Sequence, residues 1–423
     1  MRFLIAALAV TFLVLSVIVS DSNFSAGGVF EQDVKIGVYY YIWWGLPSPP
    51  YRNHWNESVK GTPFLGEYNS SDPEIADKHI ILAKQHKISF FAVSWLGTSE
   101  WYDHRYIDEQ NLKGGFLKAS HLSQFNFCLY YESKIILDSV YDMYVNYNYS
   151  DPKYPTPADF FKGVFINDTM YAAENYFNHP SYLHVDGKPV FFIHNLPNLY
   201  QNLSDTVVKG LFDDARSQLR QKHGEEAYFV GDLGSEPDVK KESEKVLNWT
   251  YSMNATTSYL FSPSNVSDSV LNDAETYYPE WLSFMNKRGM QFIPNAYPGF
   301  NNTNCEGVID PVELSPNETM FREMLKTAIK YADNNLKIVM VTSWNEWKEA
   351  TAIEPSMEFG ELFLHTIYDV VPEFPTLLIL PTFIIVTLIT IGIKTKYFRR
   401  CSSNKHEDIY GEEVYHKTQS GLA

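Results

Sequence analysis

Two glutamates, Glu346 and Glu349, lie three positions apart in the segment SWNEWKEATAIEP (343–355). They follow the apolar run 337–343, which has the length of a buried strand. On a continuing strand these side chains would face opposite ways, whereas in a helical turn their Cβ atoms come within about 5–6 Å. Two carboxyl groups at that distance can act as acid and base on one glycosidic bond. This chemistry requires the strand to end near Trp344. The alternative is two solvated acids at a helix start.

Aromatic side chains gather near the ends of other predicted strands, in YYYIWWG (39–45), SWLG (94–97) and NAYPGFNNT (295–303). A pyranose presents a flat C–H face that stacks on aromatic rings, and hydroxyls that suit Asn, His and carboxylates. The pattern therefore predicts a carbohydrate site, although core packing explains any single ring. Six of the nine tryptophans lie near strand ends: Trp43, Trp44, Trp55, Trp95, Trp344 and Trp347.

Strands and helices that alternate along the chain must position these residues. Helical patterns lie between several apolar runs, such as residues 72–87 with Asp72 as N-cap, and residues 318–335. Apolar runs without clean alternation indicate burial on both faces, as in parallel sheets. The pattern predicts a (β/α)8 barrel, with a doubly wound open sheet as the alternative. The eight predicted strands are residues 35–43, 88–95, 125–131, 189–194, 227–233, 250–260, 290–296 and 337–343.

Composition excludes several classes of protein. Of the 423 residues, 45% are apolar and 20% charged, which excludes a disordered chain, and three cysteines exclude a disulfide-built miniprotein. Cys128 lies in an apolar run and is predicted to be a core residue. The formal charge of -17 argues against a nucleic-acid partner.

The two ends of the chain predict export and anchoring. Residues 1–20 are typical of a signal peptide, with an uncleaved anchor as the alternative. Residues 376–393 form an uncharged span of transmembrane length, and basic residues open the tail 394–423. With PEFP (372–375), this end resembles the sorting signals of archaeal surface proteins, although Pro-rich spacing is an alternative. We expect a single-pass protein of the cell membrane, with residues 22–370 as one extracellular domain and the C-terminus cytoplasmic.

Glycosylation sequons support this topology. The chain has eleven Asn-x-Ser/Thr sites, all between the two apolar end segments, where chance would give about three or four. The pattern favours an exported glycoprotein. The sites are Asn23, Asn56, Asn69, Asn148, Asn167, Asn202, Asn248, Asn254, Asn265, Asn301 and Asn317.

The segment SWNEWKEATAIEP resembles a motif of glycoside hydrolase family 99, the endo-α-1,2-mannosidases and their relatives. Further matching segments run in the family's order over most of the exported domain: GVYYYIWWG (37–45), HW (54–55), residues 68–97, DGKPVFFI (186–193) and PNAYPGFNNT (294–303).

The resemblance implies a (β/α)8 barrel that cleaves inside α-mannosyl oligosaccharides or polysaccharides with retention, without a metal or other cofactor. It implies that Glu346 is the base on the sugar 2-hydroxyl, giving a 1,2-anhydro sugar, and that Glu349 is the general acid and then base. The residues expected to line sugar subsites are Tyr41, Trp43, His54, Trp95, Glu132, Tyr259, Tyr297 and Asn345.

The motif also departs from the family pattern. Lys348 replaces the usual His, Ala350 and Ala352 replace Gly and Gln, and Leu96 stands where many relatives have an aromatic residue. Lys348 is expected to lower the pKa of the neighbouring Glu349. These changes leave open a barrel that binds glycans without turnover. A structural envelope glycoprotein is a further alternative.

Overall fold

Parallel strands form the centre of the fold. The computed structural model describes residues 34–45, 53–99, 104–147, 149–234, 250–305, 308 and 310–371. Each main strand overlaps one of the eight predicted strands, and the sixth is much shorter than predicted. The strands are β1 (Lys35–Tyr40), β2 (Ile88–Trp95), β3 (Asn126–Tyr131), β5 (Lys188–Ile193), β6 (Tyr228–Asp232), β7 (Ala255–Thr257), β8 (Gln291–Ile293), β9 (Asn295–Ala296) and β12 (Ile338–Val341).

The sheet curls into a nearly closed barrel. Neighbouring strands pair in parallel in the order β8-β7-β6-β5-β3-β2-β1-β12-β9. Pro294 divides the seventh predicted strand, so that β8 pairs with β7 while β9 pairs with β12. Both ends of the strand order therefore lie on one stretch of chain. This arrangement is consistent with the predicted (β/α)8 class and excludes the open doubly wound sheet.

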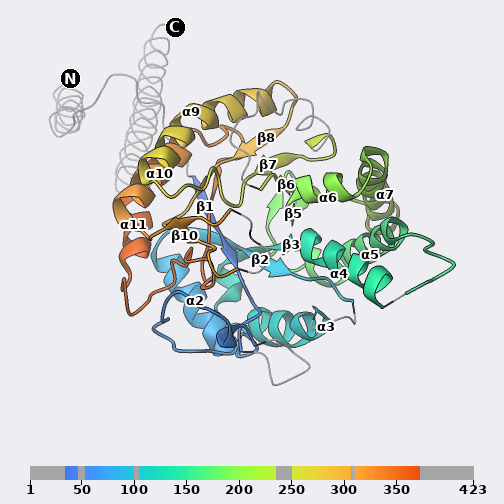
Figure 1. Ribbon diagram of the computed structural model, residues 1–423, viewed down its shortest axis with the longest axis horizontal. Helices are drawn as coiled ribbons and strands as arrows, with labels where there is room; N and C mark the ends of the chain where they lie inside the picture. Colours follow the sequence, from blue (N-terminus) through green and yellow to red (C-terminus); the bar gives the residue numbers. More distant parts are fainter. Residues whose placement is uncertain are drawn as a thin grey trace, which may run out of the picture. The chain divides into compact units, whose positions relative to one another are not determined.

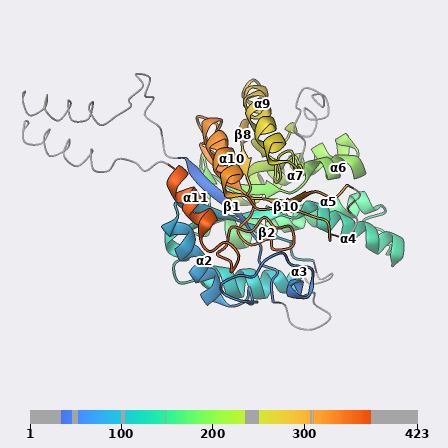
Figure 2. The same ribbon diagram turned by 60° about the vertical axis from the view of Figure 1, so that its left-hand side comes forward.

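Helices surround the strands, with α9 and α10 on one side and α2 and α3 on the other (Figures 1 and 2). The predicted start of the helix after β1 is confirmed, because Asp72 Oδ1 accepts a hydrogen bond from Glu74 N at 2.9 Å. The main α-helices are α2 (Pro73–Gln85), α4 (Ser133–Asn146), α5 (Pro157–Ala172), α6 (Leu196–Asn202), α7 (Asp205–His223), α9 (Ser267–Asn286), α10 (Glu318–Lys330) and α11 (Leu362–Val370). Shorter elements are η1 (His54–Asn56), α3 (His104–Tyr106), η2 (Ile107–Gly115), η3 (Phe116–Lys118), η4 (Leu122–Gln124), η5 (Ala173–Phe177), β4 (His184–Val185), β10 (Phe300–Asn301) and β11 (Glu313–Leu314).

The barrel interior is a packed core. A Cβ added at Gly37 would lie 2.2 Å from the ring of Phe90, so only glycine leaves room for that ring. Further along the barrel, Tyr39 packs against Tyr130 and Phe192, with ring centroids 4.7 and 6.1 Å apart. These rings support the polar residues that follow the strands.

The predicted end segments 1–20, 376–393 and 394–423 lie outside the described residues. Within the part of the chain that the structure describes, no helix has both the length and the apolar character needed to cross a bilayer. Cys128 is fully buried on β3, as predicted, and its thiol is free.

Candidate active site

The two predicted catalytic glutamates lie on a loop that follows β12. The strand ends at Val341, and residues 347–350 form a turn. The loop closes on itself, because Ser343 N donates to Thr351 O at 2.9 Å. Ser343 Oγ also accepts a hydrogen bond from Glu346 N at 2.8 Å. The chain therefore turns where the acid–base interpretation requires it.

Asn345 holds this loop against the end of β1. Its Oδ1 accepts a hydrogen bond from Tyr41 N, and its Nδ2 donates to Tyr41 O, both at 2.8 Å. Its Nδ2 also lies 3.0 Å from the Tyr68 hydroxyl. Asn345 has no exposed surface, so its amide positions the loop and does not face a sugar.

A buried polar chain holds the far end of the same loop. The Glu354 carboxylate accepts a hydrogen bond from the Tyr68 hydroxyl at 2.8 Å and lies 2.9 Å from His79 Nε2. His79 Nδ1 in turn lies 3.0 Å from the Tyr40 hydroxyl. Because these groups are buried and satisfied, they fix the loop geometry strongly.

Burial dominates the electrostatics of Glu346 and Glu349. It raises the pKa of Glu346 well above its usual range, and the charge of Glu349 adds to this effect. A hydrogen bond of 3.0 Å from Lys348 N to Glu346 Oε1 acts in the opposite direction by favouring the ionised form. Burial also raises the pKa of Glu349, against the lowering effects of His194, Lys348 and the Tyr259 hydroxyl.

Lys348 directs its ammonium group to Glu57, with which it forms an ion pair. His54 Nδ1 lies 3.2 Å from the other oxygen of the same carboxylate. Burial by itself would raise the pKa of Glu57, but His54 and Lys348 outweigh it and lower the pKa to about 2. Lys348 does lower the pKa of Glu349, as predicted, but burial outweighs this effect and the net pKa is raised.

Tyr259 lies at the centre of the aromatic residues around the pair. Its ring centroid is 5.1 Å from that of Tyr39 and 6.5 Å from that of Tyr41. Its hydroxyl donates to Glu349 Oε2 at 3.4 Å. Its backbone is fixed by Asp232, whose Oδ1 accepts from Tyr259 N at 2.9 Å. Tyr259 therefore links the barrel interior to the second glutamate.

Sequence reasoning missed a polar cluster that follows β3, β5 and β6. Tyr130 donates to Asp232 Oδ2 at 2.9 Å, and His194 Nδ1 lies 3.2 Å from the same oxygen. Burial by itself would lower the pKa of His194, but the charges of Glu132 and Asp232 outweigh it and raise the pKa. Their positions in the sequence could have indicated this cluster, because His194 and Asp232 both lie at the ends of predicted strands.

The predicted residue Glu132 belongs to this cluster. Its carboxylate accepts a hydrogen bond from Ser94 Oγ at 2.7 Å. Burial raises its pKa, against the lowering effect of His194. The charge of Glu132 also raises the pKa of Glu346 and of Glu349, so the cluster and these two glutamates share one electrostatic environment.

Only some of the predicted aromatic residues come together. The half-buried Trp43 stacks on His54, with ring centroids 5.0 Å apart, and packs against Tyr41 at 4.5 Å. By contrast, Trp95 and Tyr297 have no exposed surface. The Trp95 indole donates to Asp108 Oδ1 at 2.8 Å and the Tyr297 hydroxyl to Phe261 O at 2.9 Å. These two rings pack inside the protein and present no face to a ligand.

Comparison with known protein families identifies the family of this chain. Residues 46–367 match the family model described as "Glycosyltransferase WbsX". The chain belongs to this WbsX family. Among curated proteins, the chain is 22% identical over 359 residues to glycoprotein endo-alpha-1,2-mannosidase of Xenopus laevis, covering 76% of this chain and 69% of the relative. It is 22% identical over 375 residues to the protein of that name from Mus musculus, covering 80% and 71%.

Several solved structures have a fold similar to that of this chain. A structure named "Glycoside hydrolase-like protein" superimposes with a TM-score of 0.59 at 20% identity, covering 84% of this chain and 98% of that one. The GH99 endo-alpha-mannosidase from Bacteroides thetaiotaomicron superimposes with a TM-score of 0.57 at 20% identity, covering 79% and 95%. The resemblance to glycoside hydrolase family 99 is thus confirmed, and the relatives are named as enzymes of the predicted class.

Ala350 offers a test of the loop geometry. Ala350 directly follows Glu349, and its backbone lies in the left-handed region with φ 57°. In this region a Cβ atom destabilises the folded state by roughly 1–2 kcal/mol. We expect Ala350→Gly to raise the free energy of unfolding by up to about 1 kcal/mol, after the greater entropy of unfolded glycine is subtracted. Ala352, which has an ordinary negative φ, is the matched control, and Ala352→Gly should lower stability by about 0.5–1 kcal/mol. Urea unfolding measures both, and equal destabilisation would contradict the strained geometry.

Proposed function

We propose that the protein is a retaining, endo-acting glycoside hydrolase of α-mannosyl glycans, with Glu346 as base and Glu349 as acid and then base. The observation that carries the proposal is the placement of these glutamates. They lie on one loop after β12, burial raises the pKa of Glu349, and the Tyr259 hydroxyl contacts Glu349. A carboxyl group with a raised pKa suits the general acid that cleavage of a glycosidic bond requires.

In the first step Glu346 removes the proton from the sugar 2-hydroxyl, and the freed oxygen attacks C1. The bond from C1 to the departing oxygen breaks, and Glu349 donates its proton to that oxygen. The product is a 1,2-anhydro sugar. The hydrogen bond from Lys348 N to Glu346 Oε1 favours the ionised form that a base needs.

In the second step Glu349, now ionised, removes a proton from water. The water oxygen attacks C1 from the side that the leaving group left, and the C1–O2 bond opens. Glu346 returns the proton to O2. Each step inverts C1, so the product retains the original anomeric configuration.

The chemistry of mannose supports this substrate class. In α-mannosides the 2-oxygen and the C1 leaving group are trans and both axial, so the 2-oxygen can displace the leaving group in line. The half-buried Trp43 is the kind of aromatic side chain on which a sugar ring stacks. The curated relatives are named as endo-alpha-1,2-mannosidases, and the domain is acidic, which suits a neutral ligand better than a phosphorylated one.

The family description favours a second candidate, transfer of the sugar to another sugar. Both reactions use the same first step, and they differ in whether water or a sugar hydroxyl opens the intermediate. A barrel that binds glycans without turnover is the alternative from another class. One assay separates the three functions.

We expect the full chain to release fragments from α-1,2-linked mannooligosaccharides, and Glu346→Gln and Glu349→Gln each to lower the rate about 10²- to 10⁴-fold. Mass spectrometry measures the fragments. A mannobiosyl fluoride separates the roles, because fluoride leaves without protonation. It should restore the release of fluoride by Glu349→Gln and not by Glu346→Gln.

The matched control is Glu323→Gln, a half-exposed acid on α10 that should leave the rate unchanged. Products longer than the substrate, formed when mannose is added as acceptor, would favour transfer. Binding without any fragment would refute the hydrolase and support the glycan-binding alternative.

Lys348 generates a pH prediction. Its charge lowers the pKa of Glu346 and of Glu349, so Lys348→Met should raise both values. The base then ionises and the acid deprotonates at higher pH, and both limbs of the rate profile should move up by roughly half a unit to one unit. Lys326→Met, on an exposed lysine of α10, is the control. A profile that stays in place or moves down would show that Lys348 does not act on the pair.

We also propose that the domain works outside the cell as a glycoprotein, anchored by residues 376–393. Of the eight sequons in the described residues, six have exposed asparagines: Asn56, Asn69, Asn167, Asn202, Asn265 and Asn317. The amide of Asn254, by contrast, accepts hydrogen bonds from Arg216 and from Phe229 N at 3.0 Å.

Glycopeptide mass spectrometry of the native protein tests this location. We expect glycans at exposed sites such as Asn56 and Asn265, because the transferase needs an accessible amide, and none at Asn254. Protein that carries no glycan at any sequon would contradict export through a glycosylating compartment.

A further inference from the structure

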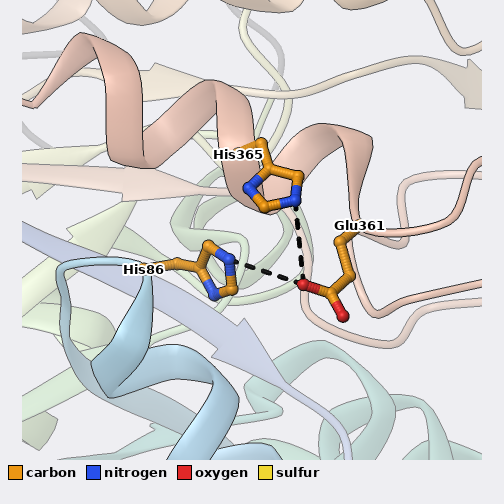
Figure 3. Close-up of side chains that lie close together, drawn as sticks. All are labelled: His86, Glu361 and His365. Atoms are coloured by element: carbon orange, nitrogen blue, oxygen red, sulfur yellow. Dashed lines mark ion pairs between the residues drawn. The ribbon is translucent and has the colours of Figure 1, made fainter.

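Two histidines and a glutamate converge outside the loop that carries Glu346 and Glu349. His86 ends α2, Glu361 directly precedes α11, and His365 lies in the first turn of α11. Figure 3 shows the three side chains pointing toward one another, with both imidazoles directed at one carboxylate oxygen. His86 Nε2 lies 3.7 Å and His365 Nε2 3.9 Å from Glu361 Oε2.

The hydrogen bond of His86 fixes which nitrogen is available. His86 Nδ1 lies 2.8 Å from Leu82 O, and a carbonyl oxygen only accepts hydrogen bonds. Nδ1 therefore carries the proton, and in the neutral ring the lone pair is on Nε2, which faces Glu361. A histidine held by a backbone carbonyl at one nitrogen and open at the other is the arrangement that metal ligands use.

Glu361 is also not committed to the helix that it precedes. It occupies the N-cap position of α11, yet its side chain makes no capping hydrogen bond. The distances from its carboxylate to the two imidazoles are too long for hydrogen bonds. The carboxylate thus faces two nitrogen atoms without bonding to either.

The spacing suits a small divalent ion. The ligand atoms of the three residues all lie within 4.8 Å of one another. A tetrahedral Zn²⁺ with bonds of about 2.0–2.1 Å holds its ligands roughly 3.3 Å apart, so contraction of under 1 Å brings the two imidazole–carboxylate pairs into range. The His365 side chain is 64% exposed and can make this adjustment.

We propose that His86, Glu361 and His365 bind one Zn²⁺ ion, with water as the fourth ligand. Two imidazoles and one carboxylate are a donor set that zinc prefers, and calcium and magnesium do not.

The site would join α2 to α11 on the side of the barrel where β2 begins. Lys87, the residue after His86, already binds the other end of α11. Its Nζ donates to Tyr368 O at 2.7 Å and to Val371 O at 2.8 Å. The ion would therefore fix the first turn of α11, and Lys87 fixes its last turn. Its role is structural and separate from the glutamate pair.

Isothermal titration of the chelator-treated full chain with Zn²⁺ tests the proposal. We expect one Zn²⁺ per chain, a rise in melting temperature with Zn²⁺, and no binding of Ca²⁺. His365→Ala and Glu361→Gln should each weaken Zn²⁺ binding at least about tenfold. His184→Ala removes an exposed histidine outside the cluster and should change nothing.

Circular dichroism shows whether each variant is folded, and the exposure of His365 makes its loss tolerable to the fold. Failure to bind Zn²⁺ at one equivalent would overturn the site. Binding that survives both His365→Ala and Glu361→Gln would also overturn it, because the ion would then lie elsewhere. Neither result depends on whether the protein cleaves glycans.

Discussion

The paired hydrogen bonds between the Asn345 side chain and the Tyr41 backbone are the constraint on which the site depends. They join the loop after the last strand to the end of the first strand, 304 positions away in sequence. An amide side chain can satisfy both an N–H and a C=O group at once, and few other side chains can. With this tie in place, the turn that carries Glu346 and Glu349 has one position relative to the barrel.

A second theme is the concentration of acidic groups where burial disfavours charge. Glu132, Glu346 and Glu349 lie in one electrostatic environment, and burial raises the pKa of each. Desolvation and like-charge repulsion act in the same direction, so these residues lower the stability of the fold. Such a cost is expected where acids are kept for chemistry. The cationic partners lie to the side, with Lys348 bound to Glu57 and His194 beside Asp232.

Membership of a family described as glycosyltransferases and likeness to endo-mannosidases are compatible in physical terms. A retaining mechanism activates C1 in the same way for both reactions, and only the second nucleophile differs. Access of water or of a sugar to the activated carbon then decides the product. The same residues therefore prepare the first step of both reactions, and only the acceptor differs between them.

The sequence by itself determined the local features. Apolar runs gave the positions of the strands, Asp72 and Pro73 gave the start of α2, and the spacing of Glu346 and Glu349 indicated paired acids. Each of these signals lies within a few residues of the feature that it predicts. The sixth strand was predicted too long, because residues 250–260 include several small polar residues and only Ala255–Thr257 pair in the sheet.

The tertiary structure alone decided which side chains share the site. Trp43 and Trp95 have similar sequence surroundings, yet one packs beside His54 and the other binds Asp108 inside the core. The approach of His194 to Asp232 and of Lys348 to Glu57 also depends on strands that meet only when the barrel forms. Such contacts depend on distances between segments far apart in sequence, and a local residue pattern does not encode these distances.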